Sequence, residues 1–373
     1  MGVWGILSGS VAARATSLGV LHALVDTVSM VVLYHEVALQ RLPYESLCQL
    51  VLVYNCVAFG LQPPLGLLCD LLGRPRLVAV FGILVSAVAL ALCDLHPLEA
   101  AVTVGVGNAL YHVGAGSVVL RMGRGRAVLA GLFVGPGALG VWMGIWLGSH
   151  GGLEKGILAL ALGLAAGYLV AMGEVEPADD PPASPGAPSA VSCILAGACV
   201  LALLGSVGIR AVVGGAFSGA WSVQGPAMPL ALALVAVLGK GMGGALADRL
   251  GWRLVGAGSL IVLAPLVSRA LLDPGSALLC TWLAQLSMAI TLAAVYGFMP
   301  RWPATAFGLP SFALLLGALP GQVEAVGQVL EPALMLGTLV TFSAVLLMLG
   351  LSWCPSWCGD LAASGNRDRP GLS

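Results

Sequence analysis

The sequence is short of charge. Only 9% of its 373 residues are Asp, Glu, Lys or Arg, whereas about 25% of an average soluble protein is charged. A soluble domain of this length needs a far more polar surface. Soluble, fibrous and disordered classes are therefore excluded, and an integral membrane protein is predicted. The net charge of −1 gives no reason to expect a nucleic-acid partner.

Other absences narrow the function. The nine cysteines lie mostly inside apolar runs, which excludes the disulfide framework of a small secreted domain. A removable signal peptide is not expected, because the first apolar stretch carries His22 and Asp26. The lack of a Walker loop disfavours ATP-driven transport, and the lack of a nucleophile beside a base disfavours an enzyme. No cofactor is predicted.

Apolar runs dominate the chain, whose mean hydropathy is +0.99. A helix that crosses a bilayer needs about 20 apolar residues. The runs between charged or proline-rich breaks predict an all-α membrane protein with twelve transmembrane helices in two six-helix bundles. The predicted spans are 12–34, 46–70, 77–94, 100–121, 127–148, 154–172, 191–214, 227–248, 253–272, 275–298, 304–323 and 331–353.

Basic residues are unevenly distributed among the connections. With twelve spans, eleven of them fall on one side of the membrane and three on the other, which puts both termini in the cytoplasm by the positive-inside rule. We expect a multi-pass protein of the plasma (inner) membrane. The eleven are Arg14, Arg74, Arg76, Arg121, Arg124, Arg126, Arg249, Arg253, Arg301, Arg367 and Arg369, against Arg41, Lys155 and Arg269.

A change of composition divides the chain in two. Residues 173–190 are acidic and proline-rich, and they cannot bury enough apolar surface to fold. The expected units are an N-terminal bundle over 1–172, this cytoplasmic linker over 173–190, a C-terminal bundle over 191–355, and a disordered cytoplasmic tail over 356–373.

A short pattern occurs once in each half, at the end of its second span. In both copies a Gly stands four residues before an Asp and another Gly three residues after it, with arginine close behind. The earlier Gly lets a neighbouring helix approach, the later Gly permits a tight turn, and the carboxylate suits the positive N-terminus of another helix. The two copies comprise Gly66, Asp70, Gly73 and Arg74, and Gly244, Asp248, Gly251 and Arg253.

This duplicated pattern resembles the cytoplasmic loop signature of the major facilitator superfamily. The twelve spans and the central linker agree with that family over essentially the whole chain. The resemblance implies two six-helix halves that rock about a central cavity, with access alternating between the two sides. It also implies that Asp70 and Asp248 are gate residues that favour one closed face. The first copy departs from the family in having Pro75 where a basic residue is usual.

Two further stretches suggest a subfamily. His22 and Asp26 in the first span, with residues 105–112 of the fourth, resemble the fosmidomycin-resistance type of efflux protein. The fifth span is similar to the glycine–proline motif of proton-coupled drug antiporters, although Leu139 stands where that motif has glycine. The matching positions are Gly131, Gly135, Pro136 and Gly140.

Ionisable side chains inside a span cost free energy and need a reason. His22 and Asp26 stand four residues apart, as do Asn108 and His112, so each pair shares a helix face. The family implies that the first and fourth helices line the cavity. The four residues are then either a proton-carrying or substrate-orienting cluster, or a polar clamp between the two helices. No metal site is predicted, because nothing fixes a four-ligand geometry.

Three polar residues in the second half are open to two interpretations each. Arg210 either meets an anionic group in the cavity or extends its guanidinium to the outer face. Lys240 either acts in the cavity or reaches the cytoplasmic surface. Gln285 either lines the cavity or holds helices together.

The function expected from these observations is secondary active transport of a small organic solute, through proton-coupled efflux by antiport. The expected partners are that solute, protons and the lipid bilayer, and the expected state is a monomer. The alternatives are a transporter-like sensor or partner subunit without flux, and a solute importer of the same fold that works by symport.

Overall fold

The computed structural model describes residues 11–38, 44–151, 155–172, 190–221, 227–322 and 332–354, and nearly all of these residues are helical. Helices are the expected form, since a segment that crosses lipid must bond its own backbone groups. Nine helical segments of the described residues are long and apolar enough to cross a membrane, and Lys155–Ala171 and Pro303–Leu319 are shorter apolar helices.

The first half has seven described helices for its six predicted spans. They are α2 (Val11–Ala38), α3 (Tyr44–Gly60), α4 (Gln62–Leu72), α5 (Pro75–Leu92), α6 (Pro97–Gly123), α7 (Ala127–His150) and α8 (Lys155–Ala171). The second predicted span, 46–70, corresponds to the single apolar segment Glu45–Leu72, which has a local break in helical hydrogen bonding next to Leu61. Pro63 and Pro64 explain the break, because proline lacks the N–H that a helix interior needs but is tolerated in a first turn.

The second half follows the same plan. Its elements are α9 (Ala190–Trp221), α10 (Ala227–Leu250), α11 (Trp252–Leu263), the 3-10 turn η1 (Ala264–Leu266), α12 (Val267–Ala270), α13 (Pro274–Gln285), α14 (Met288–Phe298), α15 (Pro303–Gln322) and α16 (Pro332–Ser352). The ninth predicted span includes η1, which contains Pro265. The tenth is interrupted at Ser287, whose hydroxyl accepts a hydrogen bond from Arg210.

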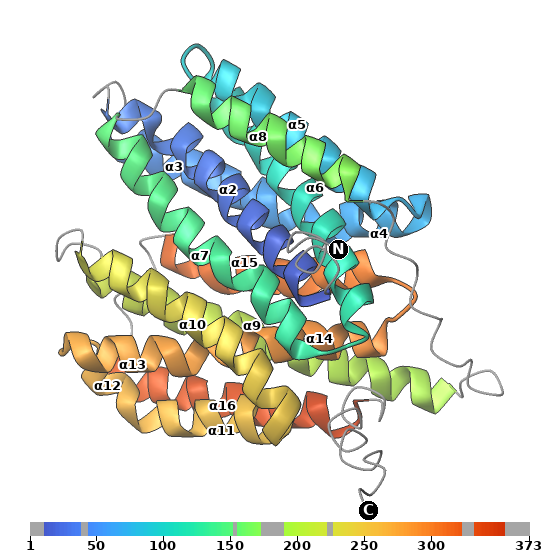
Figure 1. Cartoon of the computed structure of the whole chain (residues 1–373). Coiled ribbons are helices and arrows are strands. Elements are labelled where there is room, and N and C mark those ends of the chain that lie inside the picture. The colour runs from blue at the N-terminus through green and yellow to red at the C-terminus, as the bar shows by residue number, and fades with distance from the viewer. Residues whose placement is uncertain are drawn as a thin grey trace, which may run out of the picture.

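The helices form two bundles, α2–α8 and α9–α16, which lie on opposite sides of the molecule in Figure 1. Within the first bundle α2 packs on α7 and α5 on α6, and within the second α16 packs on α9 and α11. Two helices make most of the contact between bundles: α7 lies against α10 and α14, and α15 lies against α4 and α6. The predicted linker over 173–190, apart from Ala190 at the start of α9, and the predicted tail over 356–373 lie outside the described residues, so the domain boundaries remain a prediction.

Glycines on α7 set the spacing of three helices. A Cβ added to Gly140 would lie 2.3 Å from the carbonyl oxygen of Ala23 in α2, and a Cβ on Gly131 would lie 2.4 Å from that of Lys240 in α10. Gly135 faces α10 more loosely, and Pro136 packs beside Gly19 of α2. The four positions similar to the antiporter motif therefore place α7 in backbone contact with both bundles.

We expect Gly140→Val to force α2 and α7 apart and to lower the thermal stability of the purified protein. Overpacking of this kind costs about 1–3 kcal/mol. Gly163→Val is the matched control, because a Cβ at Gly163 in α8 meets no atom within 4 Å. Equal melting temperatures for the two variants would contradict the packing role of Gly140.

Candidate functional site

Asp70 joins the two bundles at the C-terminal end of α4. Its carboxylate accepts hydrogen bonds from the backbone N–H of Ala304 at 3.0 Å and of Thr305 at 2.8 Å, both in the first turn of α15. The hydroxyl of Thr305 also donates to it at 2.8 Å. A carboxylate at a helix N-terminus satisfies free N–H groups and offsets the helix dipole.

Asp248 makes the equivalent contact from the second bundle. Its carboxylate accepts from the backbone N–H of Ala127 at 3.1 Å and of Val128 at 2.9 Å, in the first turn of α7. The indole N–H of Trp252 donates to it at 3.0 Å. The duplicated sequence pattern thus corresponds to a duplicated contact between bundles. Sequence reasoning did not identify Trp252 or Thr305.

Glycines at matching positions allow these contacts. A Cβ on Gly66 would lie 2.6 Å from the carbonyl oxygen of Ala304, and a Cβ on Gly244 would lie 2.4 Å from that of Ala127. Any side chain at either position would push the N-terminus of the facing helix away from its carboxylate. The close approach that the spacing predicts is present at both sites, while the gating role itself stays a prediction.

The remaining residues of the two patterns serve the adjoining turns. Gly73 and Gly251 have φ values of 65° and 102°, which favour glycine. Arg74 is exposed at the start of α5. Arg253 donates to backbone carbonyl oxygens at the C-terminal end of α16, so it stabilises the second bundle and does not bridge the two bundles.

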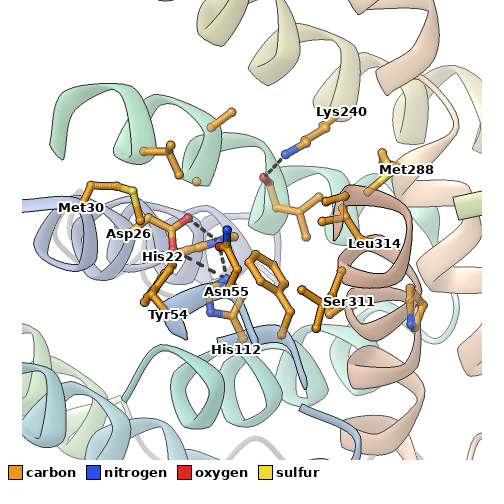
Figure 2. Close-up of a pocket in the computed structure, with 18 of the residues that line it drawn as sticks. His22, Asp26, Met30, Tyr54, Asn55, His112, Lys240, Met288, Ser311 and Leu314 are labelled. Atoms are coloured by element: carbon orange, nitrogen blue, oxygen red, sulfur yellow. Dashed lines mark hydrogen bonds and ion pairs between the residues drawn. The ribbon is translucent and has the colours of Figure 1, made fainter. Parts of the chain in front are cut away.

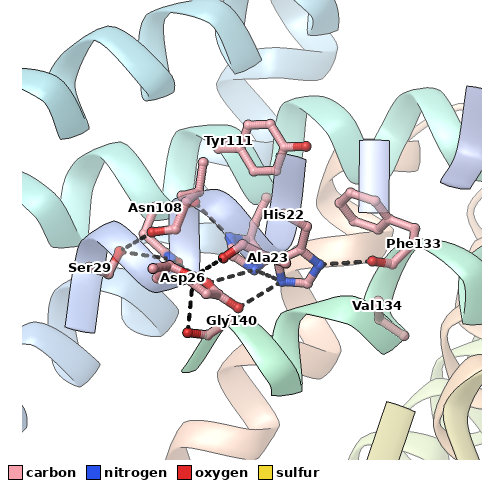
Figure 3. A network of polar contacts seen from close by, with 12 residues as sticks. His22, Ala23, Asp26, Ser29, Asn108, Tyr111, Phe133, Val134 and Gly140 are labelled. Atoms are coloured by element: carbon pink, nitrogen blue, oxygen red, sulfur yellow. Dashed lines mark hydrogen bonds and ion pairs between the residues drawn. The ribbon is translucent and has the colours of Figure 1, made fainter. Parts of the chain in front are cut away.

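The four polar residues predicted in the first and fourth spans meet in the interior, where Figure 3 shows His22, Asp26 and Asn108. The Nε2 atom of His22 lies 3.1 Å from Oδ2 of Asp26 and 2.7 Å from Nε2 of His112. The Asn108 amide donates to Oδ1 of Asp26 at 2.9 Å. All four side chains are buried. We call His22, Asp26, Asn108 and His112 the polar cluster.

Backbone carbonyls fix the hydrogens of both imidazoles. Nδ1 of His22 lies 2.9 Å from the carbonyl oxygen of Phe133, and Nδ1 of His112 lies 2.8 Å from that of Asn108. A carbonyl oxygen only accepts, so each Nδ1 carries a hydrogen and each neutral ring has a bare Nε2. Two bare Nε2 atoms 2.7 Å apart repel, whereas one proton between them makes a hydrogen bond. The arrangement therefore suits one shared proton beside the carboxylate of Asp26.

The cluster is tightly enclosed on the side of α7. A Cβ on Gly137 would lie 2.5 Å from Nε2 of His22 and 2.8 Å from Oδ2 of Asp26. The Asn108 amide also donates to the Ser29 hydroxyl at 3.3 Å. Sequence reasoning missed both Gly137 and Ser29, although Ser29 stands three residues after Asp26 and seven after His22, a spacing that places it on the same helix face.

Two groups of the described residues have the ligand types of a metal site. His22, Asp26 and His112 offer one ligand atom each, all within 4.8 Å of one another. His35, Cys93 and Asp94 form a second such group at the opposite end of α2 from its N-terminus. Three ligands with both Nδ1 atoms bonded to carbonyls are compatible with metal binding as well as with proton sharing.

Ion pairs connect helices at the second of these groups. Asp94, in the connection after α5, accepts from Nε2 of His35 at 2.7 Å and from the Lys155 ammonium at the start of α8. The hydrogen bond from Lys155 lowers the pKa of the Asp94 carboxyl, and the bond from His35 acts in the same direction. These pairs connect α2, α5 and α8 within the first bundle.

A central cavity lies between the bundles and has two lobes. The first lobe has a volume of about 560 Å³ and is lined by His22, Asp26 and His112 (Figure 2). The second has about 460 Å³ and is lined by Arg210 and Gln285. Lys240 lines both lobes. The other shared lining residues are Ala138, Val141, Ile145, Met288, Leu314 and Ala318.

The cavity accounts for the three polar residues of the second half. Arg210 is buried, with hydrogen bonds to the hydroxyls of Ser287 and Thr291, so it does not extend to the outer face. The Lys240 ammonium donates to the carbonyl oxygen of Val134 at 3.3 Å and does not reach the surface. Gln285 lines the second lobe, away from the polar cluster.

The sequence matches no protein-family model and no curated protein. The structure is similar to the human organic anion transporter MFSD10 (TETRAN), with a TM-score of 0.69 and 13% identity over 90% of this chain and 99% of that one. It is also similar to FucP, a major facilitator superfamily transporter, in the outward conformation, with a TM-score of 0.65 and 14% identity over 92% and 97% of the two chains. A form of the E. coli fucose:proton symporter FucP gives 0.63 and 12% over 91% and 96%. The chain has the fold of major facilitator transporters.

We expect Asp70→Asn to weaken the contact between α4 and α15 by about 0.3–2 kcal/mol, because the amide loses the charge that faces the helix N-terminus. Spin labels at positions 72 and 301, in a cysteine-depleted background, should then show an added population at longer distance. Asp273→Asn is the control, since Asp273 caps its own helix through Ser276. An unchanged distance distribution in the Asp70 variant would contradict the contribution of this contact.

Proposed function

We propose that the chain is a secondary active transporter that moves a small organic solute by alternating access and couples this movement to protons at the polar cluster. One observation carries the proposal. A cluster able to share a proton lines a solute-sized cavity between two bundles whose contacts at one end are made by Asp70 and Asp248.

The position of the cavity supports alternating access. On α7 the lining residues Val134 and Ile145 follow Ala127, the end that Asp248 contacts. On α10 the lining residue Lys240 precedes Asp248 itself. The cavity therefore extends away from the end that the carboxylates close. Opening that end would require the bundles to rock apart and break both carboxylate contacts.

Charge gives the proposed orientation. Basic residues such as Arg74, Arg124 and Arg249 lie in the connections beside the two carboxylate contacts, so that end is cytoplasmic by the positive-inside rule. The structure then corresponds to a state open to the outside of a plasma (inner) membrane, with both termini inside. FucP, which has a similar fold, is known in an outward conformation.

The polar cluster supplies a mechanism for coupling. With a proton between His22 and His112, the charge of Asp26 is compensated and the cluster is stable in a buried position. Loss of the proton removes the partner charge of Asp26 within the polar cluster, which favours the conformation that admits water or a proton. A proton gradient can thereby bias the exchange between conformations.

The direction of transport depends on whether the solute moves against the proton, as in antiport, or with it, as in symport. Efflux by antiport is the direction that the glycine–proline positions of α7 support, through their resemblance to drug antiporters. Symport is the second candidate, because a protein of similar fold is a fucose:proton symporter. A sensor without flux would bind solute without moving it. Exchange of a labelled solute in proteoliposomes distinguishes flux from its absence, and the sign of the pH gradient that drives accumulation distinguishes the two directions.

Asp26→Asn should abolish proton-driven accumulation of the solute and leave counterflow partly intact, because the neutral amide removes the charge that balances the proton. The test compares gradient-driven uptake with counterflow in proteoliposomes, using a solute identified by thermal-shift screening. Equal loss of both activities would make Asp26 a substrate-binding or structural residue. Full retention of both would show that it takes no part.

A cysteine in place of His150 at the C-terminal end of α7 should react with an impermeant reagent added to intact cells. A cysteine at Ser184 in the linker should react only after permeabilisation. Both variants belong in a cysteine-depleted background, since Cys48, Cys56 and Cys193 are exposed. Equal labelling of the two sites in intact cells would overturn the proposed topology.

A further inference from the structure

Arg210 is a buried cation with neutral neighbours. The residue is 7% exposed, and its guanidinium donates to the carbonyl oxygen of Ser206 and to the hydroxyls of Ser287 and Thr291. A guanidinium has five N–H groups. These three bonds therefore leave donors available, and none of the three acceptors carries charge. A buried charge without a counter-charge is costly, so a site of this kind is expected to receive one.

Lys240 adds a second cation to the same cavity. Its ammonium donates to the carbonyl oxygen of Val134, which is neutral, and it lines the lobe that contains Arg210. The nearest acid of the cavity is Asp26, but both carboxylate oxygens of Asp26 are already engaged by His22 and Asn108. Asp26 and the shared proton of the polar cluster balance each other, so the two cations remain in excess.

The described part of the second bundle offers no acid to either cation. It contains two acidic residues, Asp248 and Asp273. Asp248 holds the N-terminus of α7, and Asp273 is exposed and caps α13 through the backbone N–H of Ser276. Among the described residues of this bundle, none compensates the two cations, so an anionic group of a bound molecule can do so.

The other residues that line the second lobe indicate the chemistry of that molecule. Its walls are mainly apolar and include Trp142, Leu232 and Met288. The side-chain oxygen of Gln285 is buried and has no hydrogen-bond partner among the described residues, so it is available to accept from a hydroxyl or N–H group. The volume of about 460 Å³ suits a small organic molecule.

The geometry points to a small organic anion as the transported solute, with its carboxylate, phosphate or phosphonate group between Arg210 and Lys240 and its apolar part against the walls of the lobe. Guanidinium and ammonium groups are the usual partners of these anions, and guanidinium can bind them through two parallel hydrogen bonds. This inference rests on the proposed function for transport. The binding itself can be measured without flux.

The test uses the full-length protein in lipid nanodiscs and four probes of similar size: benzoate, phenylphosphonate, benzyl alcohol and benzylammonium. We expect one or both anions to bind at millimolar concentration or below, and the neutral and cationic probes to bind at least about tenfold more weakly. The difference between benzoate and phenylphosphonate identifies the preferred anionic group. Binding of benzyl alcohol or benzylammonium as tightly as the anions, or failure of both anions to bind, overturns the inference.

Arg210→Gln should weaken anion binding about ten- to hundredfold, the effect of losing a charge-assisted hydrogen-bonding partner. Arg269→Gln is the matched control, since Arg269 is exposed on α12 of the same bundle and should leave affinity unchanged. Lys240→Gln should give a smaller loss, and it decides the question if the Arg210 variant does not fold. Native affinity in a folded Arg210→Gln protein overturns the inference. If the Arg210→Gln protein does not fold, native affinity in Lys240→Gln overturns it.

Different results would contradict the proposed transport and the proposed anion binding. Anion binding that depends on Arg210 but is not accompanied by flux in proteoliposomes would contradict the proposed transport and leave this binding site standing. Flux of benzylammonium or benzyl alcohol, with no flux of either anion, would contradict this inference and leave proton-coupled transport standing.

Discussion

The proposed function depends on the contact between the two imidazoles of the polar cluster. Because the carbonyl oxygens of Phe133 and Asn108 each engage an Nδ1 atom, the facing Nε2 atoms of His22 and His112 need one proton between them. That proton balances Asp26 in a buried position where neither charge could stand alone. The proposed proton coupling and the proposed preference for an anion both depend on this balance.

The hydrogen bond from Nδ1 of His22 to the carbonyl oxygen of Phe133 links the polar cluster to helix packing. Phe133 belongs to α7, and α7 also carries the glycine contacts to α2 and α10 and receives Asp248 at its first turn. A change of hydrogen bonding at His22 therefore acts on the helix that connects both bundles. Packed helices shift between discrete arrangements rather than deforming gradually, so a small change at the cluster can favour one arrangement of the bundles.

Much of this arrangement could be predicted from the sequence. The four-residue spacings place His22 with Asp26 and Asn108 with His112, and the duplicated glycines and aspartates predict a carboxylate facing a helix N-terminus in each half. These are local relations, which helix geometry fixes. The spans followed from composition alone, because length and apolarity decide whether a helix crosses a bilayer.

Relations between distant segments could not be predicted in the same way. Nothing in the sequence indicates that Asp70 meets Thr305, that Gly137 encloses the cluster, or that Lys240 reaches toward α7 instead of the surface. These contacts depend on how the bundles pack. The local break next to Leu61 within the second span comes from Pro63 and Pro64, which interrupt helical hydrogen bonding without ending the apolar segment.

The most direct test of the central claim is nitrogen NMR of the histidine-labelled protein in lipid. The chain has five histidines, so the resonances of His22 and His112 can be assigned by single substitution. We expect the pair at neutral pH to show one protonated and one bare Nε2, coupled across a hydrogen bond, with both Nδ1 atoms protonated. Two bare Nε2 atoms, or an Nδ1 without hydrogen in either ring, would contradict it.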